Sequence, residues 1–440
     1  MEPKVLETIK IAVIAPTSSG KTALISTVCD YIKTKSNKAR GYTLEIENQA
    51  ARNLNSFRDA VSAQLAGQNM SFKSALITAT TETEEYKFSM NFTDKETGLS
   101  IKQPFDIMDI PGSFVIDRYK YESDTEYNKF IDHLDKSRIL WVPIDTPILM
   151  ECETPNEKSK SDMLRCRPAV QEFCVEWAQY AAENDKLDFC DFVLVKCEKY
   201  FSHDEKNEYN GCKHRFDDSY GQIVEAMKEV NQEDKFACVA VETIGAARVN
   251  TVKWVGDNLE VQYVATGNTR KIQGADCLLR DALLVAKSNV DAEIKIQKAA
   301  KETDKSKFDK LLSDIIAEQE QKIKEMESRK YALEAETMKL RGYEQQVKDA
   351  SWWDRLKGVF GFGSLPELKE KIRNLQAHLN SLTSEIETAK NKLAALRTNA
   401  ENTRGNIVAV ENEIAALDKV KEWFKSLSSG NTDSKYYRSL

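Results

Sequence analysis

The chain has 440 residues and a formal net charge of −7 at pH 7, with 30% charged and 41% hydrophobic residues. This length predicts two or three folding units, each able to bury a core. The acidic balance argues against a general nucleic-acid binder, so no nucleic acid is expected among the partners. Nine cysteines include no C-x-x-C pair and are accompanied by four histidines, which argues against a disulfide framework or a structural zinc site.

No stretch approaches the ~18 consecutive apolar residues that span a bilayer. Residues 1–10 (MEPKVLETIK) lack the basic start and apolar run of a signal peptide. Since the cysteine usage fits a reducing compartment, we expect a cytoplasmic protein that is either free or peripheral on the inner face of a membrane.

Residues 1–288 alternate short apolar runs with segments of helical periodicity. The predicted strands are 10–15, 86–92, 104–109, 138–144, 192–196 and 236–241, with Gly98 in the turn between the second and third. The predicted helices are 21–33, 45–66, 168–184 and 217–231. This alternation predicts an α/β domain with a mostly parallel sheet and helices on both faces.

Residues 289–428 have a different pattern, rich in Ala, Glu, Lys and Leu. From Leu368 to Phe424, apolar residues recur at alternating steps of four and three, and residues 312–347 carry a looser version. Such heptads predict a coiled coil. Because the glycine- and proline-containing segment 351–366 interrupts them, we predict an antiparallel helical hairpin with its tip at 351–365 and a polar tail at 429–440. The alternative is two separate helices that bind partners.

Residues 15–22 (APTSSGKT) lie between an apolar strand and a helix. They match the P-loop pattern G-x-x-x-x-G-K-[ST], with Ala15 in place of the first glycine. In such a loop the backbone N–H groups and the helix start bind phosphate, the lysine reaches the β- and γ-phosphates, and the hydroxyl binds Mg²⁺. The residues that fill these roles are Thr17, Ser18, Ser19, Gly20, Lys21 and Thr22.

The segment 105–112 (FDIMDIPG) is an apolar strand that ends in D-x-x-G. Asp109 is placed to hold the hydration shell of Mg²⁺, and the Gly112 N–H would lie where a γ-phosphate sits. A D-x-x-G sequence is common by itself, but a D-x-x-G that follows a P-loop is a specific sign of a nucleotide site.

With these motifs the sequence resembles the translation-factor-like class of P-loop GTPases, over roughly residues 9–285. The resemblance implies GTP and Mg²⁺ as ligands. It also implies a Mg²⁺-binding threonine before the second strand, for which we choose Thr81. A base-reading segment is expected at 192–198. There Lys196 would lie along guanine, and the Glu198 carboxylate would accept hydrogen bonds from the N–H groups of the base. Val195 and Glu198 depart from the [NT]-K-x-D pattern of this class. The resemblance also implies that Thr243 lies in the final base-contacting loop. Because of these departures, ATP specificity is the alternative.

The resemblance implies an enzyme, a GTP hydrolase in which water attacks the γ-phosphate with Lys21, Thr81 and Gly112 positioned around it. Ser113 and Phe114 follow Gly112, where a water-positioning Gln or His is absent. We therefore expect slow hydrolysis or hydrolysis completed by a neighbouring subunit, to which Arg118 is a candidate contributor, the alternative being an ordinary surface arginine.

Large apolar side chains gather at the predicted tip, among them Trp352, Trp353, Leu356 and Phe360, with lysines and arginines nearby. Exposed groups of this kind mark a partner or an anionic membrane surface. The alternatives are a hydrophobic plug on the hairpin and a self-assembly contact.

A GTPase domain followed by such a hairpin resembles bacterial dynamin-like proteins, with one departure: the P-loop strand begins by residue 10, without a neck helix before it. We therefore expect the nucleotide state to control self-association, through the GTPase domain or the hairpin, or membrane attachment. The alternative is a nucleotide-regulated interaction scaffold with little turnover.

Overall fold

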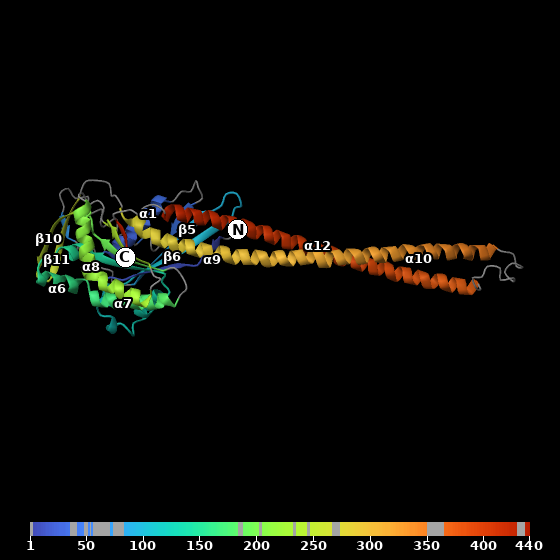
Figure 1. Cartoon of the computed structure of the whole chain (residues 1–440), viewed down its shortest axis with the longest axis horizontal. Coiled ribbons are helices and arrows are strands. Elements are labelled where there is room, and N and C mark those ends of the chain that lie inside the picture. The colour runs from blue at the N-terminus through green and yellow to red at the C-terminus, as the bar shows by residue number, and fades with distance from the viewer. Residues whose placement is uncertain are drawn as a thin grey trace. The chain divides into compact units, whose positions relative to one another are not determined.

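The computed structural model describes most of the chain. The described residues are 3–35, 42–47, 52, 54–55, 71–73, 83–183, 188–201, 205–231, 235–243, 247–265, 273–349, 365–428 and 436–440. The chain divides into two compact units, one formed by Met1–Ile294 together with Ala415–Leu440 and the other by Lys295–Ile414. We call them the sheet unit and the helical unit (Figure 1).

The main sheet of the sheet unit has the strand order β12-β9-β8-β7-β2-β6-β5-β3, with β1 also paired to β6. Its strands are β1 (Lys4–Val5), β2 (Ile9–Val13), β3 (Tyr42–Ile46), β5 (Glu84–Thr93), β6 (Ser100–Asp109), β7 (Ile139–Asp145), β8 (Phe189–Val195), β9 (Lys235–Val241) and β12 (Tyr437–Ser439). Five of the eight described pairs are parallel, and β5, β3 and β12 join antiparallel. The predicted mostly parallel sheet is confirmed.

The described helices of this unit are α1 (Lys21–Lys35), α3 (Gly112–Ile116), α4 (Thr125–Asp135), α5 (Thr146–Met150), α6 (Pro155–Leu164), α7 (Arg167–Ala182), α8 (Glu205–Val230) and the first part of α9 (Ala275–Lys310), with a short 3₁₀ turn at Arg118–Lys120. Every residue of β7 and of β8 is buried. Strands covered on both faces are near-continuous apolar runs, which predicted β7 at 138–144. The prediction of 192–196 for β8 missed residues 189–191, because Asp191 interrupts the apolar run.

One helix prediction is wrong at its start. Residues 45–46, expected to begin a helix over 45–66, belong to strand β3, which pairs antiparallel with β5. Tyr42 of β3 stacks on Phe92 and on Trp423, with ring centroids 5.4 Å and 4.3 Å apart. These partners are distant in sequence, so a local pattern does not reveal the strand. Most of 48–70 lies outside the described residues.

A second, three-stranded sheet has the order β10-β11-β4. β10 (Ala247–Val255) and β11 (Asn258–Ala265) form a hairpin, and β4 (Ser71–Lys73) pairs antiparallel with β11. Sequence reasoning did not predict these strands. Val249, Val261 and Tyr263 form their small buried cluster.

The expected polar tail at 429–440 is also corrected, because Tyr437–Ser439 is strand β12 on the edge of the main sheet. Tyr436 is buried beside it. The last part of α12 (Leu365–Ser428) likewise belongs to the sheet unit. Here Phe424 is buried, and Lys419 forms ion pairs with Asp94 and Glu96.

The helical unit contains the end of α9, a π-helical turn at Leu311–Ile316, α10 (Ala317–Asp349) and most of α12. Cross-helix contacts join Lys301 to Glu411, Glu320 to Arg397, Glu327 to Lys390, and Arg341 to Gln376. The partner's number falls as the first number rises, so the two helical stretches pair in opposite directions (Figure 1).

Burial along α12 follows the heptads found in the sequence. Within 368–414 the heptad positions are buried or half-buried, and most residues between them are exposed. The predicted tip, with Trp352, Trp353, Leu356 and Phe360, lies outside the described residues. In the described part of the chain, no helix combines the length and apolar character needed to cross a bilayer.

Candidate functional site

The loop between β2 and α1 lies at the carboxyl end of the parallel strands. Residues 9–13 pair in parallel with β6 and with β7, so the loop leaves from the middle of the sheet. Helix α1 starts at Lys21. Because the first N–H groups of a helix have no partner within it, this end attracts anions.

Lys21 is buried, with 5% of its surface exposed. Its ammonium donates to the carbonyl oxygens of Ala15 at 3.1 Å and Pro16 at 3.2 Å. Burial lowers the pKa of Lys21, opposed by the negative charge of Asp109 and assisted by the positive charge of Lys196. A buried ammonium that donates to carbonyl oxygens gains from an incoming anion.

Thr22 and Asp109 meet although they are 87 residues apart: the Thr22 hydroxyl donates to Asp109 Oδ2 at 3.0 Å. Asp109 is fully buried at the end of β6, opposite Val13 of β2. Two oxygen ligands, a hydroxyl and a carboxylate, therefore lie side by side next to a buried lysine. Oxygen ligands of this type suit Mg²⁺.

Gly112 begins α3 and lies directly against the loop 15–22. A Cβ atom at this position would come within 2.0 Å of the Thr17 backbone nitrogen. Only a glycine allows the two backbones to approach so closely. The expected neighbourhood of Gly112 and the P-loop is therefore present.

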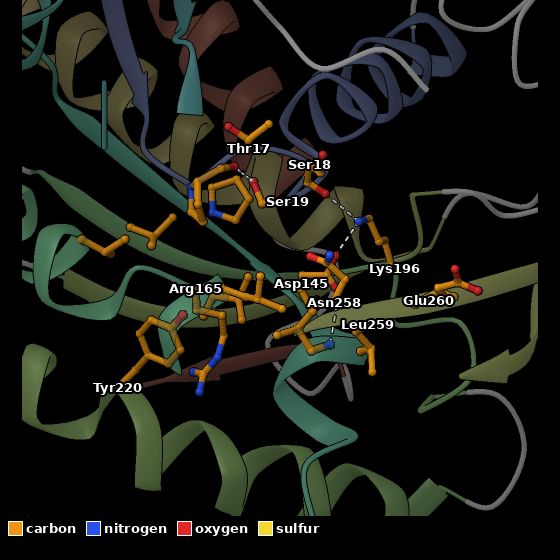
Figure 2. A pocket seen from close by; sticks show the side chains of 18 residues that line it. Thr17, Ser18, Ser19, Asp145, Arg165, Lys196, Tyr220, Asn258, Leu259 and Glu260 are labelled. Atoms are coloured by element: carbon orange, nitrogen blue, oxygen red, sulfur yellow. Dashed lines mark hydrogen bonds and ion pairs between the residues drawn. The ribbon is translucent and has the colours of Figure 1, made fainter. Parts of the chain in front are cut away.

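Lys196 follows β8 and crosses to the same loop. Its ammonium donates to the carbonyl oxygen of Ser18 at 2.7 Å and forms an ion pair with Asp145 (Figure 2). Ser18 and Lys196 both have positive φ, 64° and 57°. Non-glycine residues rarely adopt this conformation, and such strain is concentrated at functional sites.

Asp145 was not identified from the sequence. It ends β7, caps α5 by accepting the N–H of Ile148 at 3.2 Å, and pairs with Lys196. Its only sequence signal is a carboxylate directly after the apolar run 139–144. Because the carboxyl ends of parallel strands share one edge, that signal places it near the loop, but not against Lys196 in particular.

Glu198 and Thr243 lie on the Lys196 side of the site. The Lys196 N–H donates to Thr243 Oγ1 at 3.3 Å, and the Thr243 carbonyl accepts from Thr27 Oγ1 at 3.3 Å. Glu198 is 8% exposed. Burial, with the charges of Glu198 and Glu242, raises the pKa of the neighbouring Cys197 thiol. Lys196, Glu198 and Thr243, which were predicted to contact the base, thus follow the carboxyl ends of the neighbouring strands β8 and β9.

A cavity of about 410 Å³ opens beside residues 16–19. Asp145, Lys196, Arg165, Tyr220 and residues 258–261 of the second sheet are among its lining residues (Figure 2). Arg165 packs over the Tyr220 ring and donates to Asp162 at 2.7 Å. Residues 258–261 bring the second sheet up to the outer side of the loop.

Two further candidate residues do not enter this description of the site. Thr81 lies outside the described residues. Arg118 is bound to the sheet unit itself: its guanidinium donates to Glu176 at 3.1 Å and lies 4.7 Å from the centre of the Phe173 ring. Among the described residues, no group of three or more His, Cys, Asp or Glu side chains is arranged to hold a metal.

Comparison with known proteins yields a distant likeness. No protein-family model and no curated protein matches the chain. Two solved structures of the S. cerevisiae Ski7 GTPase-like domain match, one bound to GTP (13% identity, TM-score 0.29) and one bound to GDP and inorganic phosphate (12% identity, TM-score 0.27). The matches cover 56% and 57% of this chain but only 45% and 46% of those chains. A likeness of this degree does not identify a shared family.

Proposed function

We propose that the chain is a Mg²⁺-dependent P-loop GTPase. The observation that carries this proposal is the hydrogen bond from Thr22 to Asp109 beside the buried Lys21. It joins the two motifs that the sequence offers for phosphate and metal, and it places them at the start of a helix. A hydroxyl, a carboxylate and an ammonium in this arrangement fit the phosphates of a nucleotide and the metal that accompanies them.

The residues present fit Mg²⁺. The Thr22 hydroxyl would bind the ion, and Asp109 would hold waters of its hydration shell. When bound, Mg²⁺ would neutralise part of the charge that develops on the phosphates. Lys21 would bind the β- and γ-phosphates in place of the Ala15 and Pro16 carbonyls. The Gly112 N–H would orient the γ-phosphate, with Thr81 as a further ligand.

The Lys196 contact to Ser18 supports a base site on that side of the loop. Lys196 would lie along the base, Glu198 would accept from the N–H groups of guanine, and Thr243 would orient the loop that ends the pocket. These N–H groups distinguish guanine from adenine. Calorimetric titration with GTP and with ATP side by side therefore tests whether the site selects guanine. A preference for ATP would show that Glu198 does not select guanine.

Phosphate release tests the enzyme. Lys21→Ala should abolish Mg²⁺-dependent release of phosphate from GTP, because its ammonium is the group placed to stabilise the transferring phosphate. Lys120→Ala is the matched control, since Lys120 is exposed and pairs only with Asp117 among the described residues. If Lys21→Ala releases phosphate as fast as wild type, the hydrolase proposal fails.

A second candidate is a regulated scaffold that binds nucleotide with little turnover. It is favoured by the residues after Gly112, since Phe114 is buried and Arg118 is held by Glu172 and Glu176. Single-turnover measurement separates the two functions. A scaffold would retain GTP for many minutes without cleaving it.

For the helical unit we propose an antiparallel coiled-coil hairpin that mediates self-association or membrane attachment in a nucleotide-dependent way. Its support is the heptad burial of α12 and the antiparallel cross-helix contacts. Co-sedimentation with vesicles that contain anionic lipid, comparing wild type with the Trp352→Asp, Trp353→Asp double variant, tests the membrane role. Equal sedimentation of the two proteins would exclude it. Analytical ultracentrifugation with GTP and with GDP tests self-association.

A further inference from the structure

The C-terminal residues lie along the outer edge of the main sheet. β12 pairs antiparallel with β9, with Tyr437 opposite Val239. The N–H of Ala240 donates to the carbonyl of Tyr436 at 2.9 Å, which extends the pairing toward the carboxyl end of β9. Thr243 follows that end, so Tyr436, at the start of the C-terminal strand, lies toward the base side of the candidate site.

Tyr436 is fixed on both its ring and its hydroxyl. It is 7% exposed, and its ring stacks on Phe201 at a centroid distance of 5.6 Å and an interplanar angle of 19°. The hydroxyl lies 2.8 Å from Glu242 Oε1 and also contacts the side-chain amide of Gln273. A phenol has one proton, so the hydroxyl donates to only one of these two oxygens at a time, and the charged Glu242 carboxylate is the stronger acceptor.

Glu242 connects Tyr436 to the nucleotide side. Its own N–H donates to the Gln273 carbonyl at 3.1 Å, so Glu242 is held by both its backbone and its side chain. The next residue, Thr243, accepts the N–H of Lys196 and contacts α1 through Thr27. A displacement of Glu242 would therefore move the group that orients the Lys196 backbone.

Resting on the function proposed above, we propose that Tyr436 is a positioning residue of the nucleotide site. Its hydroxyl fixes the chain at 242–243, and thereby the base-side residues Lys196 and Thr243, while leaving the phosphate cradle at 15–22 to its own contacts. The C-terminal strand is thus part of the site. Its effect should fall on recognition of the nucleoside and not on binding of the phosphates.

Tyr436→Phe removes the hydroxyl and keeps the ring stacked on Phe201. In the full-length chain with Mg²⁺, we expect GTP affinity, measured by calorimetry, to fall about tenfold, because one hydrogen bond to a charged group is lost. Binding of inorganic tripolyphosphate, which uses only the phosphate cradle, should stay unchanged. Tyr437→Phe is the matched control, because its hydroxyl lies near Asp281 and away from residue 242.

Each outcome is decisive. Unchanged GTP affinity in Tyr436→Phe overturns the proposal, as does an equal loss for GTP and tripolyphosphate, which would indicate a general structural role. A loss of the same size in Tyr437→Phe would assign the effect to the strand and would also overturn it. If wild type binds tripolyphosphate but not GTP, the proposed GTPase function fails, and the role of Tyr436 fails with it. If wild type binds neither, the nucleotide site itself is rejected.

Discussion

The sheet unit and the helical unit use charged side chains in opposite ways. In the sheet unit, Arg138 is buried and forms an ion pair with Asp188 at 2.6 Å, with side-chain exposures of 7% and 1%. In the helical unit, Arg397 pairs with Glu320 at 2.7 Å, with exposures of 60% and 39%. The two ion pairs have similar distances, but their different exposure to solvent decides how much each contributes to the free energy of unfolding.

Because Arg138 and Asp188 are buried, each charge depends on the other for its stabilisation. Arg138 also donates to the Asn289 side chain at 3.1 Å, and the Asn289 amide donates to the Glu7 carbonyl at 3.1 Å. This network joins β7, the start of β8, α9 and the N-terminal strands. The helical unit instead relies on repeated apolar positions, with ion pairs on its surface.

The largest expected effect separates these two ion pairs. Arg138→Ala leaves Asp188 buried without its cation and should lower the free energy of unfolding by about 3–5 kcal/mol. Arg397→Ala should change it by about 0.5 kcal/mol or less, since exposed pairs are screened by solvent. Urea denaturation followed by near-UV circular dichroism, which reports the buried Trp141 and Trp177, measures the first. Far-UV dichroism measures the second. Equal losses would contradict the comparison.

A glycine substitution should have opposite signs in the two units. A Cβ on Gly274, which has φ +81°, would lie 1.8 Å from the Ala240 carbonyl oxygen, whereas nothing lies within 4 Å of a Cβ on Gly405. Gly274→Ala should therefore destabilise by about 3 kcal/mol. Gly405→Ala, inside α12, should stabilise by up to about 1 kcal/mol. Thermal denaturation of both variants checks the signs, and a stable Gly274→Ala protein would show that β9 can shift.

The smallest of the three effects concerns pH. Asp191 of β8 and Asp281 of α9 are both fully buried, and the charge of Asp281 acts on Asp191. Burial raises the pKa of Asp281 to about 6, and burial together with the charge of Asp281 raises the pKa of Asp191 well above its usual range. A raised folded-state pKa gives stability at low pH that is lost as pH rises through that value.

We therefore expect the free energy of unfolding to fall by about 2–3 kcal/mol as pH rises from 4 through 6 toward 8. Asp281→Asn should remove the part of this dependence that Asp281 contributes and raise stability at pH 8. Asp257→Asn should leave it unchanged, because the Asp257 side chain is 90% exposed. A pH profile that stays as steep in Asp281→Asn would assign the dependence to other groups.

Sequence reasoning succeeded where a local pattern carries the information. Continuous apolar runs predicted most of the parallel strands. The P-loop pattern and the strand that ends in D-x-x-G predicted that Thr22 and Asp109 lie together, because the carboxyl ends of parallel strands share one edge, and the two side chains are in contact. The heptads of α12 identified its less exposed face, since 3.5-residue spacing returns to the same side of a helix.

Tertiary structure alone decided the contacts between distant residues. Asp145 meets Lys196 and Tyr436 meets Glu242, because strand order and the return of the C-terminus bring them together. The β3 strand, the second sheet and β12 were missed for the same reason: their pairing partners lie far along the chain, and short strands of mixed polarity carry no periodicity of their own. The sequence by itself predicted the residues of the proposed phosphate and metal site, and the fold determined which side chains lie against them.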